Sequence, residues 1–236
     1  MKRSWMMGVA VATLASGAAV ASDKQVLRAD FDNQVLGQAP GTRGAAFGEP
    51  IATSGAVVDL APLPTPNLRV SDTSECCGLS TYFEFLDGRE LATGTVMVRA
   101  SVLYTGHSQA NIRLSPRGSF GPDLFQLYTS YNSTRLYAFT GTLNAGEIGE
   151  APANQLVQLA IDLSPELRKV SVRLDGETLL ENHDFTFDGE RGVGRMFVGH
   201  AHNPLIAEDV MRLDDLRVIH CDSPEFADCI FIDGYD

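Results

Sequence analysis

Apolar and polar residues alternate with a period of two along most of the chain. Between residues 95 and 103 every even position holds Val or Ala, and the same alternation recurs over residues 157–163 and 169–174. This pattern is typical of antiparallel strands that bury one face in a core and turn the other toward water. Further strands are predicted at 26–31, 56–60, 67–71, 81–86, 110–114, 124–129, 135–139, 195–200 and 211–219.

Turn-forming residues separate these segments. Asp175-Gly176 predicts a tight hairpin between 169–174 and 177–180, and Ser115-Pro116 marks another turn. Only residues 164–167 have a helix-like sequence, and this segment is long enough for just one helical turn. Many short strands without alternating helices predict an all-β fold, a single antiparallel β-sandwich.

The alternation changes phase within the last predicted strand. Apolar residues occupy odd positions up to Leu213, whereas Leu216 and Val218 occupy even ones. Asp214-Asp215 stands at the break, which predicts a β-bulge there.

The first 21 residues have the composition of a signal peptide. Lys2 and Arg3 precede an apolar run, and Ala19-Val20-Ala21 has the small-x-small pattern of a cleavage site. The run is short for a bilayer span of about 20 residues, and no later stretch is suitable. We therefore expect a signal peptide at 1–21, a sandwich domain at 22–220, a tail at 221–236, and a secreted, periplasmic or cell-surface protein without a transmembrane span.

The chain of 236 residues is acidic, with a formal net charge of −12. Removal of Lys2 and Arg3 with the signal peptide would change this charge to −14. Such a surface repels phosphate backbones, which argues against nucleic acid as a partner. It also disfavours strongly anionic polysaccharides unless basic residues cluster, and Arg113, Arg117 and Arg135 are the candidates for such a cluster.

Four cysteines remain in the predicted mature chain, as the pairs Cys76-Cys77 and Cys221…Cys229. An oxidising compartment favours disulfides, and four thiols allow three connectivities. Cys221–Cys229 would close a short loop. Cys76 and Cys77 would form a vicinal bridge, or each would pair with one C-terminal cysteine. No Cys-x-x-Cys spacing occurs, so a zinc ribbon or thioredoxin-like site has little support.

Three sequence blocks resemble the concanavalin A-like lectin/glucanase superfamily, and laminin-G-like domains in particular. They are the opening block 27–32 (Leu-Arg-Ala-Asp-Phe-Asp) with 36–40, the block 156–176 with its Asp-Gly hairpin, and the closing block 213–218 (Leu-Asp-Asp-Leu-Arg-Val). The resemblance implies a jelly roll of two curved sheets, with the closing strand beside the first and a concave face that often binds glycans. The ending 229–236 resembles short tails of exported bacterial proteins and suggests a sorting tag.

The same resemblance implies a structural calcium ion between the opening and closing strands. The matching carboxylates are Asp30, Asp32, Asp214 and Asp215. Calcium prefers hard oxygen ligands, and a bound ion would tie the two chain ends together.

Sequence motifs that would indicate an enzyme are weaker than the resemblance to a binding fold. Gly106-His107-Ser108-Gln109-Ala110 departs by one residue from a nucleophile elbow, but a strand follows it, so a surface hairpin loop is expected. The superfamily's glucanase run Glu-x-Asp-x-x-Glu is absent. Glu84 is a lone carboxylate, and Glu147 and Glu150 are expected in a Gly-rich loop.

Polysaccharide lyases of this fold use a His/Tyr pair with Arg and Gln or Asn, which implies four candidate catalytic residues: Arg113, Tyr128, His200 and His202. The two histidines project to one side of a strand and would bind a metal only with a third ligand, for which Glu208, Asp209 and His183 are the candidates.

Glycan binding requires aromatic platforms, and the predicted mature chain contains no Trp because Trp5 lies in the signal peptide. Stacking would therefore fall to tyrosines, which include Tyr82 and Tyr104. The hairpin around residues 124–139 is the preferred site on the concave face, with six ligand-binding candidates: Asn111, Gln126, Tyr128, Tyr131, Asn132 and Tyr137. The leading hypothesis is a secreted or envelope-associated module that binds a carbohydrate or cell-surface component; the alternatives are a polysaccharide lyase or hydrolase, and a structural surface protein.

Overall fold

The computed structural model describes most of the chain between residues 23 and 229. The described ranges are 23–32, 34–38, 45–47, 50–51, 56–60, 63–71, 80–85, 88–117, 123–140, 143–186, 191–201 and 209–229. The predicted signal peptide, Cys76, Cys77, His202 and the last seven residues lie outside them. Within these ranges no helix combines the length and the apolar character that crossing a bilayer requires.

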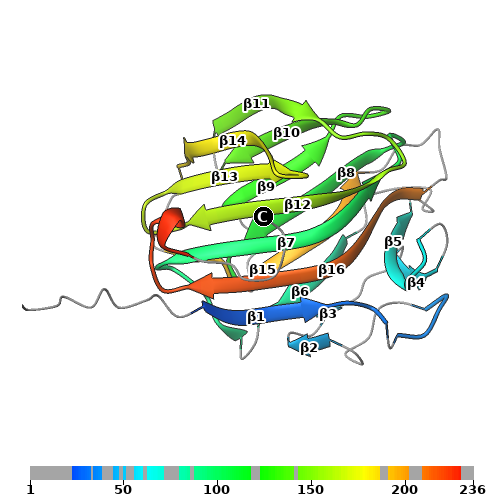
Figure 1. Cartoon of the computed structure of the whole chain (residues 1–236), viewed down its shortest axis with the longest axis horizontal. Coiled ribbons are helices and arrows are strands. Elements are labelled where there is room, and N and C mark those ends of the chain that lie inside the picture. The colour runs from blue at the N-terminus through cyan, green and yellow to red at the C-terminus, as the bar shows by residue number, and fades with distance from the viewer. Residues whose placement is uncertain are drawn as a thin grey trace, which may run out of the picture.

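Two antiparallel sheets pack face to face (Figure 1). The first, sheet A, has the order β14-β13-β12-β7-β16-β1-β2, with β5 paired to β16 and β4 paired to β5. Its strands are β1 (Asp23–Ala29), β2 (Ala45–Phe47), β4 (Ala56–Asp59), β5 (Asn67–Ser71), β7 (Thr95–Tyr104), β12 (Leu156–Ser164), β13 (Lys169–Leu174), β14 (Glu177–Asp184) and β16 (Asp209–Cys221).

The second sheet, sheet B, has the order β11-β10-β9-β8-β15-β6-β3. Its strands are β3 (Pro50–Ile51), β6 (Ser80–Glu84), β8 (Gln109–Ser115), β9 (Phe125–Thr129), β10 (Arg135–Thr140), β11 (Leu143–Glu150) and β15 (Arg195–Ala201). A short 3-10 turn, η2 (Phe226–Asp228), follows the last strand. The predicted all-β antiparallel sandwich is thus confirmed.

Every strand predicted from the alternation is present, whereas β2, β3 and β11 were not predicted. The assignment of Glu147 and Glu150 to a Gly-rich loop is wrong, because both residues belong to β11. This strand pairs with β10 through two register shifts, and Gly146 has a positive φ of 83°. Glycines that accommodate these irregularities interrupt the apolar alternation by which a strand is recognised.

The first and last strands of the domain lie side by side, as the resemblance implied. Leu27 pairs with Val218 and Ala29 with Leu216, and Figure 1 shows β1 in blue beside β16 in orange. The predicted bulge is also present. The register between β16 and β7 shifts between Asp214 and Arg217, and Asp215 has a positive φ of 49°.

Of the connections predicted from the sequence, the Asp175-Gly176 hairpin is confirmed and the Ser108 hairpin loop is wrong. Asp175 and Gly176 both have positive φ, as a tight hairpin between β13 and β14 requires. The segment around Ser108 is not a hairpin loop, because β7 belongs to sheet A and β8 to sheet B. It crosses from one sheet to the other.

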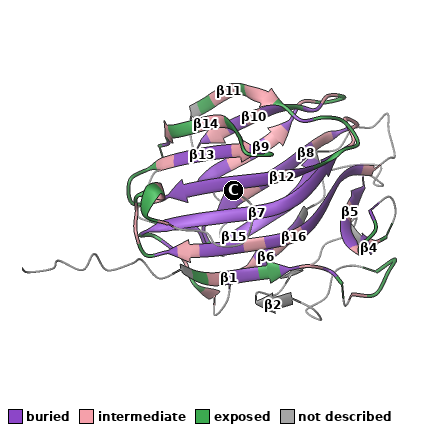
Figure 2. Cartoon of the chain, in the orientation of Figure 1, coloured by how far each residue is buried: buried purple, intermediate pink, exposed green. Residues whose placement is uncertain are grey.

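The core lies between the sheets and is built from the inward-facing apolar residues of both. All ten residues of β7 are buried, on both of its sides (Figure 2). On the outward side Met97 packs with Ile219, Cys221 and Cys229. Cys221 and Cys229 form a disulfide with a Cα–Cα distance of 5.8 Å, which confirms one of the predicted pairings. The C-terminal segment therefore covers part of the outward face of sheet A.

A buried ion cluster occupies the same outward face. The Nη1 atom of Arg99 lies 2.7 Å from Oδ1 of Asp162, and Nη2 of Arg173 lies 3.1 Å from Oδ2 of Asp162. The Arg99 side chain is only 4% exposed. A buried guanidinium requires such pairing, because removing its charge from water without a partner is costly.

Candidate functional site

The outward face of sheet B carries a row of polar and aromatic side chains. The strand register places Tyr137 of β10 opposite Tyr128 of β9, and Tyr128 opposite Asn111 of β8. The two tyrosine rings are stacked, with centroids 5.5 Å apart and planes inclined by 18°. Both rings are half-buried and lie on adjacent strands.

A hydrogen bond orients the outer ring of this pair. The hydroxyl of Tyr137 donates to Oε2 of Glu147 on β11 over 3.2 Å. Arg135 forms an ion pair with the same carboxylate oxygen at 3.6 Å. The ring position is thus supported from the neighbouring strand β11.

Two amide side chains flank Tyr128. Asn111 is only 7% exposed, yet its Oδ1 atom accepts no hydrogen bond. Gln126 lies two residues before Tyr128 on the same side of β9 and is half-buried. Within the described part of the chain, neither side chain has a hydrogen-bond partner. Buried polar atoms are usually paired, so Oδ1 of Asn111 is a hydrogen-bond acceptor that the described residues leave unused.

A second row runs parallel to the first across four strands. Arg113 of β8 pairs with Gln126 on one side and with Phe197 of β15 on the other, and Phe197 pairs with Tyr82 of β6. The rings of Tyr82 and Phe197 have centroids 4.1 Å apart. The guanidinium carbons of Arg113 and Arg195 lie 4.4 Å and 4.7 Å from the centroid of Phe197.

The amino-acid sequence alone does not point to Phe197 or Arg195 as site residues. The alternation in residues 195–200 places them on one side of their strand. Nothing in that segment shows that this side meets Arg113, because β8 and β15 are about 80 residues apart in sequence.

The suggested cluster of Arg113, Arg117 and Arg135 does not form. Arg113 is paired with Asp123 at 3.6 Å, and Asp123 also accepts a hydrogen bond from the Ser115 hydroxyl. Arg117 instead lies near Glu84, and Arg135 lies with Glu147 on the opposite side of the tyrosine pair. Arg113 and Arg195 instead both lie over the ring of Phe197.

The other predicted stacking residues lie elsewhere. Tyr131 and Asn132 form the tip of the β9–β10 hairpin, where Tyr131 is 49% exposed and Asn132 has a positive φ of 53°. Neither belongs to the strand rows. Tyr104 is buried in the core, and this burial raises the pKa of its hydroxyl.

The candidate catalytic residues are not brought together. His200 pairs with Ala110 of β8, whose side chain belongs to the core. Tyr128 and Arg113 occupy the opposite, outward side of the same sheet. His200 is therefore separated from them by the sheet itself, and His202 lies outside the described residues.

The carboxylates assigned to calcium lie where β1 ends and β16 bulges. Asp214 accepts hydrogen bonds from the Thr65 hydroxyl at 2.7 Å and from the Asp215 amide at 2.8 Å. Burial raises the pKa of Asp214, and the negative charges of Asp215 and Asp32 raise it further. In the described ranges no three His, Cys, Asp or Glu side chains are grouped closely enough to hold a metal ion. Calcium binding thus stays a prediction, and both oxygens of Asp214 already have protein partners.

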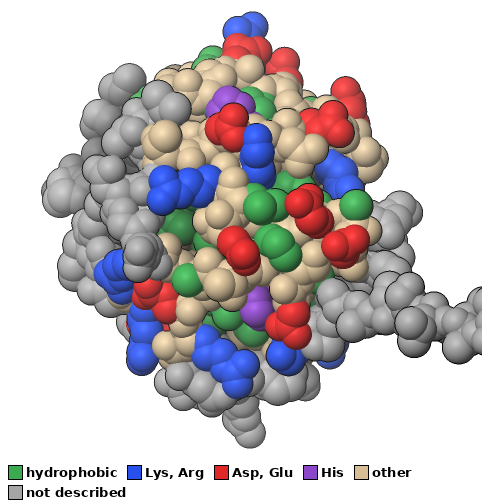
Figure 3. Space-filling view, turned by 90° about the vertical axis from the view of Figure 1, so that its left-hand side faces the viewer, with side chains coloured by type: hydrophobic (Ala, Val, Ile, Leu, Met, Phe, Trp, Pro, Cys, Tyr) green, Lys and Arg blue, Asp and Glu red, His purple; other side chains and the backbone are tan. Residues whose placement is uncertain are grey.

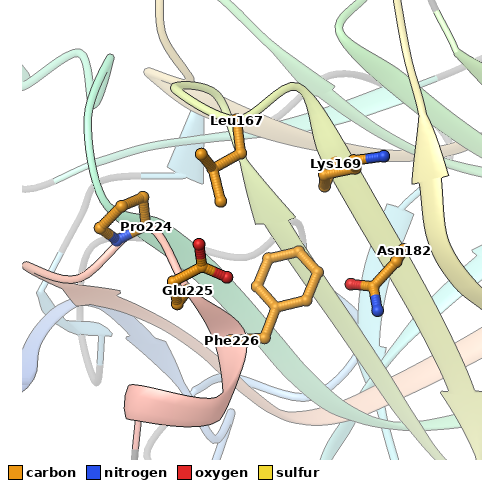
Figure 4. Close-up of a pocket in the computed structure, with 6 residues that line it drawn as sticks. All are labelled: Leu167, Lys169, Asn182, Pro224, Glu225 and Phe226. Atoms are coloured by element: carbon orange, nitrogen blue, oxygen red, sulfur yellow. The ribbon is translucent and has the colours of Figure 1, made fainter.

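Two adjoining surface hollows, of about 330 and 280 Å³, lie beside sheet A. They share Asn182, Glu225 and Phe226, and Figure 4 shows Phe226 and Leu167 extending into the first hollow from η2 and from the β12–β13 turn. The cations at their rims are paired, Lys169 with Asp184 and Arg173 with Asp162.

At the end of the sandwich near η2, the charged side chains of the described residues are of both signs. Acidic and basic side chains are interspersed there (Figure 3).

No family model matches the sequence, and no curated protein matches it in sequence. Solved structures do match the fold. The sialidase of Trypanosoma rangeli superposes with a TM-score of 0.56 at 11% identity, over 83% of this chain and 30% of that chain. Its complex with sialic acid gives a TM-score of 0.55 at 13% identity, over 89% and 33%.

A structure of botulinum neurotoxin type C, whose cell entry depends on interaction with two ganglioside molecules, gives a TM-score of 0.54 at 6% identity, over 82% and 46%. The chain spans less than half the length of each of these proteins. At such low identity, the likeness shows a shared β-sandwich fold alone.

Proposed function

We propose that this chain is an exported carbohydrate-binding module of the concanavalin A-like type, and that the outward face of sheet B is its binding surface. The observation that carries this proposal is the stacked pair Tyr128–Tyr137 beside the buried, unpaired amide of Asn111. The apolar faces of a sugar ring stack on aromatic rings, while amide side chains both donate to and accept from its hydroxyl groups.

The fold neighbours are compatible with this proposal. The sialidase has been captured with sialic acid, and the neurotoxin interacts with gangliosides. A polysaccharide-degrading activity has less support, because His200 lies on the core side of the sheet that carries Tyr128. The proposed export rests on the predicted signal peptide.

Tyr128→Ala is expected to weaken glycan binding at least tenfold, about 1.4 kcal/mol, because the sugar loses its stacking surface. Tyr128→Phe keeps the ring and is expected to retain most of the affinity. The measurement is retention on an array of neutral and acidic oligosaccharides, followed by titration calorimetry with the retained ligands. Leu156→Ala, which removes an exposed apolar side chain from sheet A, is the matched control and is expected to bind like the parent protein. Unchanged binding by Tyr128→Ala would contradict the proposal.

Asn111→Leu is expected to weaken binding at least tenfold without lowering the melting temperature. Leucine has the branching of asparagine but carries no polar atom that needs a partner. Replacing an unpaired buried amide by an apolar group of similar shape is neutral or stabilising for the fold. A side chain required only for folding would behave in the opposite way: Asn111→Leu would melt at a lower temperature and bind glycan normally. Thermal melts and calorimetry on the same samples separate the two cases.

A further inference from the structure

A row of arginines crosses the outward face of sheet A. Arg28 of β1 pairs with Arg217 of β16, and Arg217 pairs with Arg99 of β7. Ala160 of β12 follows, with Arg99 on one side and Arg173 of β13 on the other. Adjacent strands are about 4.8 Å apart. The fold thus gathers guanidinium groups on one face of a chain whose net charge is −12.

The carboxylate of Asp162 is shared within this row. It lies 2.7 Å from Arg99 and 3.1 Å from Arg173. The side chains of Arg28, Arg173 and Arg217 are 44%, 37% and 25% exposed, so they can be reached from outside the sheet. Like charges directly opposite each other on adjacent strands are destabilising. Additional carboxylates would therefore stabilise this row.

The disulfide places Cys229 next to the arginine row. Cys229 is bonded to the end of β16 and packs with Met97 and Ile219 on the outward face. Arg99 and Arg217 are the next outward residues on the same two strands, and alternate residues of a strand are about 6.6 Å apart. Figure 1 shows η2, which precedes Cys229, at the end of this face where β7 begins. The chain therefore leaves Cys229 beside the arginines.

The outward side of β7 is buried well beyond its contact with the disulfide loop. Ser101 and Leu103 lie four and six residues past Met97, yet they are only 5% and 4% exposed. The outward residues of an antiparallel sheet normally face water. The exposure of β7 is instead typical of a strand that packs against another segment along its length.

The residues that follow Cys229 are complementary to this face in polarity and charge. Residues 230–236 are Ile-Phe-Ile-Asp-Gly-Tyr-Asp, three apolar side chains followed by a stretch with two carboxylates. Seven extended residues span about 23 Å, whereas β16 and β13 are about 14 Å apart. Asp233 and Asp236 can lie about 10 Å apart, which is about two strand spacings. Both carboxylates can therefore reach the row.

We propose that residues 230–236 bind to the outward face of sheet A in their own molecule. Their three apolar residues extend the cluster of Met97 and Ile219, and the carboxylates of Asp233 and Asp236 bind the arginine row. Hydrogen bonds between guanidinium and carboxylate groups are charge-assisted and strong. The disulfide holds the segment beside its site, which makes the binding intramolecular. This inference is independent of the proposed carbohydrate-binding function, which uses sheet B.

A single tryptophan tests whether the segment is bound. The expected mature protein, without residues 1–21, has no Trp, so Phe231→Trp introduces a unique fluorescent side chain. Acrylamide is expected to quench it about threefold less than it quenches the same residue in a free peptide of sequence 229–236, because a packed indole is screened from water. Equal quenching in protein and peptide would overturn the proposal.

The contribution of the arginine row is tested in the same Phe231→Trp background. Asp233→Asn combined with Asp236→Asn, and separately Arg217→Gln, are expected to raise quenching toward that of the peptide. Sodium chloride at about 1 M, where the Debye length is about 3 Å, is expected to act in the same direction. The matched control is Arg117→Gln, which removes the same charge from an ion pair with Glu84 at 3.6 Å. Its quenching is expected to equal that of the parent.

Thermal melts of all variants establish that they are folded. Low quenching that survives both the paired Asp→Asn change and Arg217→Gln would show that the arginine row does not bind the segment. An increase in Arg117→Gln as large as in Arg217→Gln would assign the effect to net charge and would also overturn the proposal. Protection that appears only at high protein concentration would mean that the segment binds a second copy of the chain instead.

Discussion

Asp162→Asn is expected to lower the free energy of unfolding by about 3 kcal/mol. The substitution removes the negative charge that lies 2.7 Å from the Arg99 guanidinium, in a place where Arg99 is 4% exposed. Breaking a buried pair by changing one partner leaves a charge that water cannot solvate, and such changes cost about 3–5 kcal/mol. The lost ion pair with Arg173 accounts for half of this loss in unfolding free energy or less, because the Arg173 side chain is 37% exposed and water screens its charge.

Urea unfolding of the disulfide-bonded protein, monitored by fluorescence or circular dichroism, measures this change. Asp184→Asn is the matched control. It removes the same charge from an ion pair with Lys169 at the surface of the same sheet, where Asp184 is 79% exposed. No measurable loss is expected there. If the two variants unfolded at the same urea concentration, the outward face of sheet A would not carry a desolvated ion cluster.

Gly192→Ala is expected to destabilise the domain by about 3 kcal/mol, which corresponds to a fall in melting temperature of about 6–12 °C for a domain of this size. A Cβ atom on Gly192 would lie 2.0 Å from the carbonyl oxygen of Leu91 and 2.4 Å from the amide nitrogen of Ala92. Both are backbone atoms, so the two segments would have to separate.

That separation would break a short bridge between the two segments. Leu91 and Val193 exchange two backbone hydrogen bonds of 2.7 and 2.9 Å, and the Gly192 amide donates to Glu90 over 3.1 Å. Gly149→Ala provides the comparison. Its Cβ would meet only Leu179, a side chain that can rotate away. We expect Gly149→Ala to cost less than about 1 kcal/mol. Equal melting temperatures for the two alanine variants would show that the backbone at Gly192 yields easily.

The alternation of apolar and polar residues located the strands, but it gave a wrong prediction for the outward side of one of them, β7. The odd positions of residues 95–103 were expected to face water. Met97 and Arg99 are buried instead, because β7 is a central strand whose outward side is covered by the disulfide-bonded C-terminal segment and by the Arg99–Asp162 pair. A period of two separates the two sides of a strand, but it does not report what lies above either side.

In the candidate site too, the sequence identified residues that lie close together in the chain but missed those that a distant strand contributes. The sequence identified Tyr128, Tyr137 and Gln126 as a unit, because one hairpin carries all three. It also led to Asn111, although not to the fact that its amide oxygen is buried without a partner. It did not lead to Phe197 or Arg195, which reach the site from β15.

What the amino-acid order alone settled is local: which segments are strands, which side of each is apolar, and where the chain turns or bulges. The pairing of β8 with β15, and hence the meeting of Arg113 with Phe197, was settled only by the folded molecule. Side-chain alternation repeats every two residues in every strand, so it is equally compatible with many partners. The choice among them depends on how both sheets close over one shared core.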